Sequence, residues 1–309
     1  MTLVSSPDAA WKVSALHVYP VKSCGGVAVA AAQVTATGLK YDRLWMLLYE
    51  KTGRFVTQRQ EPHMALIKVA IDEPGNRLVL SADSMADVLA VPLHPQAGDL
   101  GEQFAVRVWY DDVIGRCCGD SARAWLSAFI GKPVRLVYKD PDATRMVSRY
   151  VPSPDICPLP PQSSFADVFP FHITTQPSLA HVNKNVPRPL SQANFRPNIV
   201  LDNSAGAAYD EESWTLIEFS SESGESWQMC VASRTPRCTM PNVDLATGAM
   251  SKDREPMKSL RKFRCSDPGK PSQVCFGMQA APTTVGQTIH VGQAVAVRER
   301  GEHSLTQPL

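Results

Sequence analysis

The 309-residue sequence lacks the cysteine spacings of the common metal and redox motifs. No two cysteines form a C-x-x-C pair, which argues against a structural zinc site and against a redox dithiol. The C-x4-C-x2-C spacing of plant-type iron–sulfur proteins is also absent, so we expect no cluster in this chain. We expect reduced thiols rather than disulfides at the eight cysteines, which are Cys24, Cys117, Cys118, Cys157, Cys230, Cys238, Cys265 and Cys275.

Long apolar runs and an excess of one charge are absent as well. Nowhere do about 18 apolar residues follow one another, and residues 1–8 have neither a basic opening nor an apolar core. We therefore expect no transmembrane anchor, no signal peptide, a mobile N-terminus over residues 1–10 and a cytoplasmic location. The 31 basic and 30 acidic residues give a net charge of +1, which does not favour nucleic-acid binding.

What the sequence has in abundance is short strands. Apolar, β-branched and aromatic segments separated by turn residues are expected strands, and their close spacing favours barrels over βαβ units. One helix is predicted at 121–130, capped by Asp120 or Ser121 and stopped by Gly131, and another at 178–185. The expected strands cover residues 13–19, 28–35, 44–49, 55–58, 65–71, 77–81, 88–93, 104–110, 134–138, 171–174, 198–201, 214–219, 227–232 and 289–297.

The chain length favours two domains, since 309 residues exceed a typical single core. A proline-rich segment over residues 140–161 reads as a linker or a long surface loop. We expect a mainly β protein with some α structure, composed of a β-barrel-like domain over 11–138 and a second β-barrel domain with a few helices over 139–309.

One cysteine stands in an unusual setting. The segment Ser-Arg-Thr-Pro-Arg-Cys at residues 233–238 places Cys238 beside Arg234 and Arg237, before an Asn/Asp/Thr-rich turn. Neighbouring cations favour the thiolate, which is both a nucleophile and a metal ligand. Arginine forks also match phosphate-like oxyanions. The combination is typical of a phosphorylated metal cofactor, although a lone cysteine is more often a small buried apolar residue.

Three further clusters carry polar groups at strand ends. Tyr-Pro-Val-Lys-Ser-Cys-Gly-Gly at 19–26 presents Lys22 and Ser23 at a glycine turn, where both suit phosphate, or where Lys22 is simply solvated. Asp-Arg-Leu-Trp at 42–45 places Arg43 before an apolar strand. Asn-Phe-Arg-Pro-Asn-Ile-Val at 194–200 fixes Arg196 and Asn198, with structural capping as the alternative.

Two other segments are ambiguous. The adjacent Cys117 and Cys118 are expected to pack rather than to chelate a metal. A run of basic residues at 252–264 is either a solvated helix face or a docking surface for an acidic electron-transfer partner; its members are Lys252, Arg254, Lys258, Arg261, Lys262 and Arg264.

Taken in order, these clusters resemble the molybdenum cofactor sulfurase C-terminal (MOSC) family with its N-terminal β-barrel companion domain. The chain looks most similar to the amidoxime reducing components within that family. Tyr-Pro-Val-Lys-Ser-Cys and Asp-Arg-x-Trp match the opening of the family, while Arg-Pro-Asn-Ile-Val and Arg-Cys-(x)4-Val-Asp-x-x-Thr-Gly match its second half. The resemblance extends from residue 13 to about residue 297.

The resemblance implies a role for each matching residue. Cys238 would supply the protein sulfur to molybdenum, the other sulfurs coming from the pterin of the molybdenum cofactor (Mo-molybdopterin). Lys22, Ser23 and Arg43 would hold the pterin and its phosphate. Four further residues complete the implied set: Thr174 and Thr175 as hydroxyl donors, Arg196 and Asn198 closing the site. Arg237 would lie beside the ligand cysteine.

The implied activity is a molybdenum-dependent reduction of N-hydroxylated substrates such as amidoximes and hydroxylamines, with nitrite or nitrate as further candidates. The sequence has no G-x-G-x-x-G fingerprint and no haem or iron–sulfur motif. Electrons would then come from a separate b5-type cytochrome and its flavin reductase. Two alternatives stay open: a non-catalytic binder or carrier of the molybdenum cofactor, and a metal-free enzyme with Cys238 as covalent nucleophile. The second lacks a histidine placed by any motif next to Cys238.

Overall fold

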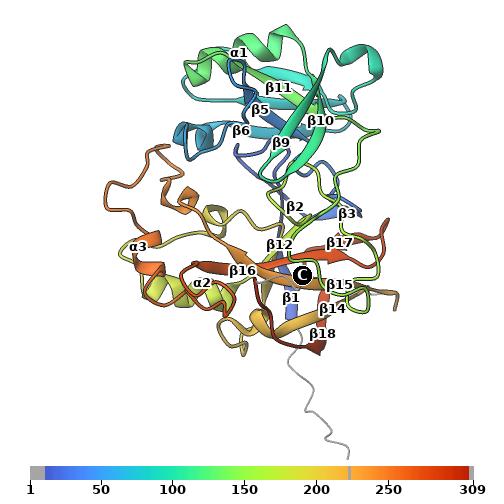
Figure 1. The fold of residues 1–309 in the computed structure, drawn as a ribbon, viewed down its shortest axis with the longest axis vertical. Coiled ribbons are helices and arrows are strands. Elements are labelled where there is room, and N and C mark those ends of the chain that lie inside the picture. Colours follow the sequence, from blue (N-terminus) through green and yellow to red (C-terminus); the bar gives the residue numbers. More distant parts are fainter. Residues whose placement is uncertain (1–10, 222–223, 306–309) are drawn as a thin grey trace, which may run out of the picture.

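The computed structural model describes residues 11–221 and 224–305. The predicted mobile N-terminus at 1–10 therefore lies outside the described residues. The described part is mainly β, as expected, with three α-helices, and it forms two layered regions one above the other (Figure 1). No helix in residues 11–221 or 224–305 combines the length and the apolar character needed to cross a membrane.

The larger region is a closed seven-stranded barrel. Its strands follow the order β13-β12-β16-β15-β14-β18-β1, and a pairing between β13 and β1 closes the ring, while β2 extends β1. β12 and β13 are parallel. The bounds are β1 (Trp11–Val18), β2 (Val27–Val29), β12 (Phe171–Thr175), β13 (Ile199–Asp202), β14 (Trp214–Ser220), β15 (Ser226–Pro236), β16 (Cys275–Pro282) and β18 (Ala294–Arg300).

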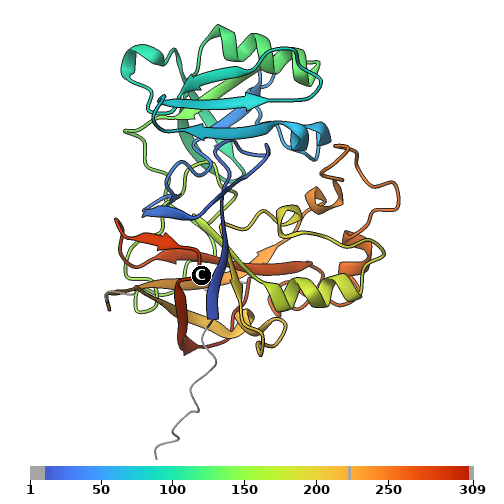
Figure 2. The ribbon, with the colours of Figure 1, turned by 180° about the vertical axis from the view of Figure 1, so that it is seen from behind.

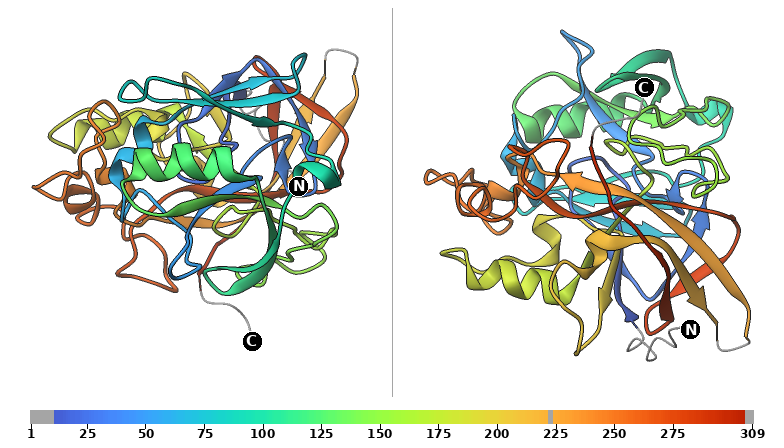
Figure 3. Two further views of the ribbon diagram at one scale, coloured as in Figure 1. Left: turned by 90° about the horizontal axis from the view of Figure 1, so that it is seen from above. Right: turned by 60° about the horizontal axis from the view of Figure 1, so that its bottom comes forward.

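The smaller region contains two antiparallel sheets and one helix. One sheet has the order β5-β11-β10-β9 and the other β6-β7-β8. The helix α1 (Asp120–Ile130) packs on β11 and β8 and is nearest the viewer when the molecule is seen from above (Figure 3). The strands are β5 (Trp45–Tyr49), β6 (Lys68–Asp72), β7 (Arg77–Ser81), β8 (Leu89–Pro92), β9 (Gln103–Val108), β10 (Asp111–Cys117) and β11 (Val134–Lys139).

The N-terminal strand joins the two regions. β1 pairs with strands of the second half of the chain, and the segment after it enters the smaller region, as the view from behind shows (Figure 2). A third, small sheet pairs β17 (Thr288–His290) with β3 (Ala31–Thr35), which pairs with β4 (Gly38–Leu39). The helices α2 (Gln176–Lys184) and α3 (Met257–Leu260) belong to the larger region. The predicted domain division at residue 138 stays a prediction.

The structure corrects several expected elements. Residues 55–58 form no strand, only a single bridge from Phe55 to Leu48, because the side chain of Gln60 accepts hydrogen bonds from Thr57 and closes a local turn. The strands β4, β10 and β16 were not expected, and the single strand expected at 289–297 is two strands of different sheets, β17 and β18. The helix α1 starts after Gly119 without a side-chain cap from Asp120 or Ser121, whereas Gly131 ends it in the left-handed conformation as predicted.

The proline-rich segment is more than a surface linker. Arg145 within it is 2% exposed, forms an ion pair with Asp111, and donates to three carbonyl groups of residues 164–167. Those contacts fold the chain between β11 and β12 back against the space between the two regions. The segment therefore helps to build the site described next.

Candidate functional site

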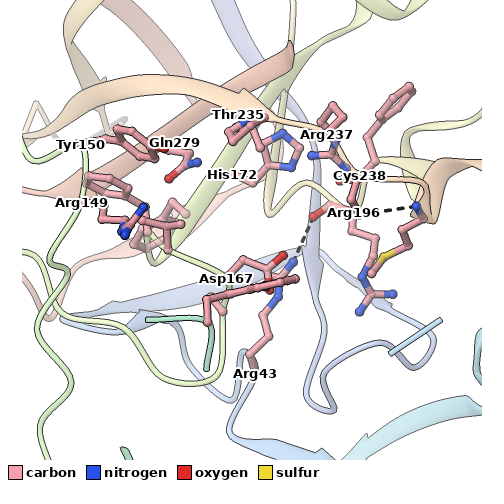
Figure 4. Close-up of a pocket in the computed structure, with 18 of the residues that line it drawn as sticks. Arg43, Arg149, Tyr150, Asp167, His172, Arg196, Thr235, Arg237, Cys238 and Gln279 are labelled. Carbon is pink, nitrogen blue, oxygen red and sulfur yellow. Dashed lines mark hydrogen bonds between the residues drawn. The ribbon is translucent and has the colours of Figure 1, made fainter. Parts of the chain in front are cut away.

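A cavity of about 380 Å³ lies between the two regions and collects most of the residues singled out from the sequence. Figure 4 shows Arg43 below the cavity, Arg196, Arg237 and Cys238 at one end, and Arg149, Tyr150 and Gln279 at the other. The lining comes from the segment after β1, the turn before β5, the loops around β12 and β13, and the end of β15. Residues more than 200 positions apart thus share one site.

Arg43 is fixed by a network that leaves its guanidinium beside the cavity. Its Nη1 atom donates to Oδ2 of Asp42 at 2.6 Å and to Oδ1 of Asn198 at 3.0 Å, while Nη2 donates to the carbonyl of Arg196 at 3.1 Å. Asn198, 1% exposed, also accepts from the backbone amide of His172. Asn198 is therefore a positioning residue for Arg43 as well as part of the cavity wall.

Arg196 and Arg43 stack on the same aromatic ring. Their guanidinium carbons lie 4.2 Å and 4.6 Å from the centre of the Tyr19 ring. Ser23, Arg43 and Arg196 all adopt positive φ angles of 69°, 49° and 58°. Non-glycine residues in that conformation carry a backbone cost and cluster at functional sites, so three separate turns are each held in a strained form at one cavity.

Lys22 faces the cavity from the smaller region. Its Nζ atom donates to the carbonyl of Phe165 at 2.7 Å and forms an ion pair with Asp167 at 2.5 Å. Burial lowers the pKa of Lys22, and the Asp167 carboxylate opposes that effect. The indole nitrogen of Trp109 donates to the same Asp167 carboxylate at 2.9 Å, so Asp167 connects Lys22 to the outer rim.

Cys238 lies directly after β15, partly exposed in the wall of the cavity. The only hydrogen bond to its sulfur within the described residues comes from the amide of Met240 at 3.5 Å. Arg237 donates from Nη2 to the carbonyl of Phe195 at 2.9 Å. Its backbone amide donates to Val274, which anchors the cysteine loop to the residue preceding β16.

The charges around the cavity do not balance. Of the four cations near Cys238, Lys22 is paired with Asp167 and Arg43 with Asp42, whereas Arg196 and Arg237 have no carboxylate partner within the described residues. Burial, together with repulsion from Arg43, lowers the pKa of Arg196 to about 10, and burial also lowers the pKa of Arg237. A bound anion would relieve both effects.

Several buried polar atoms of the cavity wall have no hydrogen-bond partner within the described residues. Three of them can donate and belong to residues expected to hold the cofactor: Oγ of Ser23, Nη2 of Arg196 and Nε of Arg237. Buried donors are normally paired. A phosphate carries about two negative charges and several acceptor oxygens, so it matches both the unpaired donors and the excess charge. The residues present thus fit a phosphorylated group with a sulfur-ligated centre next to Cys238.

Two of the predicted cofactor residues are not brought into the cavity. Thr174 and Thr175 are 0% exposed and are absent from its lining. The Thr174 hydroxyl donates to Gln192, and Thr175 caps α2 while contacting Ser178 and Glu211. Their hydroxyls have structural partners, in contrast to the unpaired hydroxyl of Ser23.

Other lining residues had no signal in the sequence. Trp109 lies in a hairpin turn, Asp167 lies between the proline-rich segment and β12, and Gln279 lies in the unexpected β16. His172 precedes a predicted residue but carries no motif; burial, with repulsion from Arg237, lowers its pKa to about 3, so its imidazole is neutral. Only the fold brings these four side chains to one place.

The fold and the site together define a class: a two-region β protein with a cysteine and a cluster of cations that line one cavity between the regions. Two family models match the chain, the MOSC N-terminal beta barrel domain over residues 10–133 and the MOSC domain over residues 160–296.

Curated relatives extend over most of the chain. It is 33% identical to the mitochondrial amidoxime-reducing component 1 of Mus musculus over 92% of this chain and 81% of that protein. It is 32% identical to the mitochondrial amidoxime reducing component 2 of Bos taurus, over 92% and 82%. The chain belongs to this family of MOSC proteins. Among solved structures, the YuaD protein of Bacillus subtilis is similar over 93% of this chain and 94% of its own, with 10% identity and a TM-score of 0.36.

Proposed function

We propose that this protein is a molybdenum-cofactor-dependent oxidoreductase that reduces N-hydroxylated substrates such as amidoximes and hydroxylamines. The observation that carries the proposal is the cluster of unpaired donors and excess positive charge beside Cys238. The names of the relatives, amidoxime-reducing components, support the substrate class. When bound, the cofactor supplies the two-electron chemistry; the N–O bond breaks, two electrons and two protons enter, and the oxygen leaves as water.

The residues of the chain bind and orient in this proposal. The thiolate of Cys238 is the soft sulfur ligand that a redox-active metal prefers. Ser23, Arg196 and Arg237 direct unpaired donors to phosphate oxygens, and Asn198 and Asp42 hold Arg43 in register. Lys22, restrained by its ion pair with Asp167, adds a further positive charge to the cavity lining. His172 stays neutral and adds no further charge to a cationic cavity.

The electron donor is proposed to be an acidic b5-type cytochrome, reduced by its flavin reductase. Five basic residues around α3 form the basic patch: Lys252, Arg254, Lys258, Arg261 and Lys262, all exposed. Arg264, expected in the same run, is instead 3% exposed and paired with Glu212, so we exclude it from the patch. Complementary charge would accelerate docking of an acidic carrier.

The basic patch is linked to the cysteine loop by short contacts. Asn242, four positions after Cys238, accepts through Oδ1 from the amide of Met257 at 3.0 Å, and its carbonyl accepts from Ser251 at 2.8 Å. A carrier docked on the patch would thus lie over a segment hydrogen-bonded to the ligand loop.

The test is turnover of benzamidoxime by protein produced in a host that makes the molybdenum cofactor. The Cys238→Ala variant is expected to lose at least about 100-fold of the activity because the metal loses its protein ligand. Cys265→Ala is the matched control, since Cys265 is also partly exposed but lies outside the cavity. Full activity in Cys238→Ala would contradict the proposal.

A protein that only carries the cofactor would use the same cluster of cations. Oxidation of the bound cofactor by the substrate distinguishes the reductase from the carrier. Reduced, cofactor-containing protein is mixed with benzamidoxime, and its visible absorption spectrum is followed. A reductase is expected to reoxidise with formation of benzamidine. A spectrum that stays reduced, in protein with full molybdenum content, would favour the carrier.

A further inference from the structure

The outer end of the cavity is built differently from the end at Cys238. We call the cavity mouth the group Trp109, Tyr110, Arg149, Tyr150 and Lys270, all of which line the cavity. Tyr110 is 60% exposed and Trp109 38% exposed. Figure 4 shows Arg149 and Tyr150 together at the end opposite Cys238. The mouth thus combines aromatic rings with cations, and Asp167 links its Trp109 to Lys22 at the inner end.

The two cations of the mouth contact aromatic rings instead of carboxylates. The guanidinium carbon of Arg149 lies 3.3 Å from the centre of the Tyr110 ring. Nζ of Lys270 contacts the Tyr150 hydroxyl and lies 5.0 Å from that ring. The nearby carboxylates of Asp111 and Asp167 are already paired with Arg145 and Lys22. Two positive charges at the entrance therefore have no anionic partner within the described residues.

Two aromatic residues of the mouth have a strained backbone conformation. Trp109 and Tyr110 form the two-residue turn between β9 and β10, and Trp109 has a φ of 58°. Such turns favour Gly, Asn or Asp at positions of positive φ. Tyr150 also has a φ of 58°. Bulky aromatic residues at two such positions indicate that ring surface at the entrance is retained at a conformational cost.

A buried amide separates the mouth from the inner end. Gln279 is 6% exposed, lines the cavity, and its Oε1 atom has no hydrogen-bond partner within the described residues. The hydroxyl of Thr235, on the same wall, is also unpaired. Buried polar groups are normally paired, and polar atoms of a ligand in the cavity would supply partners for these two.

We propose that the mouth selects planar aromatic N-hydroxylated substrates that carry an acidic group, with the ring stacked on the mouth aromatics and the acid bound by Arg149 and Lys270. The inference rests on the proposed reductase function and specifies its substrate class. The N-hydroxylated end of such a substrate would pass Gln279 and Thr235 toward Cys238. Electrostatic and stacking contacts both contribute to affinity in this arrangement.

The experiment compares benzamidoxime with 4-carboxybenzamidoxime in the complete, cofactor-containing protein. Without an electron donor no turnover occurs, so calorimetry gives the Kd of each compound, and steady-state assays with donor give each KM. We expect a Kd and a KM about three- to tenfold lower for the carboxylated compound, as for a partly exposed charge pair. Equal values for the two compounds would overturn the inference.

Variants of mouth residues test whether the mouth causes the tighter binding of the carboxylated compound. Arg149→Gln and Lys270→Gln should bring the ratio of the two Kd values close to one, while Lys51→Gln, which removes a charge from an exposed turn, should leave it unchanged. Trp109→Asn, which suits the turn, should weaken both compounds by a similar factor. A loss of molybdenum in Arg149→Gln would assign Arg149 to the cofactor and overturn the inference.

The same measurements distinguish a failure of this inference from a failure of the proposed reductase function. If the carboxylated compound binds more tightly but neither compound is reduced, the proposed reductase function fails and the acid-binding mouth stands. If both are reduced with equal KM, the function stands and the inference fails.

Discussion

At the scale of single residues, the sequence motifs located the inner end of the cavity. Four residues that are far apart in the chain line one cavity: Lys22, Arg43, Arg196 and Cys238. They could be predicted because each lies in a polar turn next to an apolar strand, and that pattern is visible in the sequence. Thr174 and Thr175 were assigned by resemblance alone, and the structure gives their hydroxyls to Gln192 and to the α2 cap. The sequence alone does not show which way these side chains point.

The lowered pKa of His172 predicts how the free energy of unfolding depends on pH. Its pKa falls from 6.5 in an unfolded chain to about 3 in the folded protein, first because of burial. The folded state therefore binds fewer protons, and stability present above pH 6.5 is lost as the pH falls toward 3. In cofactor-free protein we expect His172→Gln to remove about 2–3 kcal/mol of the stability lost between about pH 7 and about pH 4.5.

Urea unfolding of wild type and His172→Gln at both pH values measures that difference directly. The wild type should lose more stability on acidification than the variant. Identical losses would show that His172 is protonated in the folded protein, against the neutral imidazole assigned here.

At the scale of elements, most strands with alternating or β-branched sequence were predicted, whereas β16, a buried strand of different composition, was missed. β16 is buried along its whole length and contains Gly277 and Gln279, so it has neither alternation nor β-branched residues to mark it. It nevertheless lies between β12 and β15 and contributes Gln279 to the cavity. A central strand is specified by its neighbours more than by its own residues.

Gly277 makes this dependence testable. It has a φ of 73°, and a Cβ atom there would lie 2.5 Å from Nε2 of His172 and 2.6 Å from the carbonyl of Ile173. Gly131, at the end of α1, has a φ of 75° and open space around it. We expect Gly131→Ala to cost about 1 kcal/mol through strain alone and Gly277→Ala about 3 kcal/mol or more, since the backbone must also move.

Thermal or urea unfolding of the two variants separates strain from collision. The matched φ angles make Gly131→Ala the reference for the conformational cost. If both substitutions cost the same, then β12 and β16 are not packed as closely as described.

At the scale of the whole molecule, the sequence predicted two β regions but not what joins them. The segment over 140–161 was read as a linker from its prolines, yet Arg145 anchors it and the following residues against Asp111 and the cavity. Long-range ion pairs of this kind leave no local pattern. For the same reason the cavity mouth, which combines a hairpin turn with this segment, was not predicted.

The basic patch predicts how electrons enter. Reduction by an acidic b5-type cytochrome should slow several-fold as ionic strength rises from about 0.05 M to about 0.5 M, because salt screens the complementary charges. The double variant Lys258→Gln, Arg261→Gln should lower the low-salt rate by about tenfold, while reduction by dithionite stays unchanged. Stopped-flow absorbance measures both rates, with Lys51→Gln as the control. A salt-independent rate would place the donor elsewhere.

The proposed function depends on a bond between the sulfur of residue 238 and molybdenum, which X-ray absorption at the molybdenum edge detects. Cofactor-containing wild type and Cys238→Ser protein are compared. We expect one sulfur neighbour fewer around molybdenum in the variant. The same sulfur coordination in both proteins, or no molybdenum in wild type from a competent host, would contradict it.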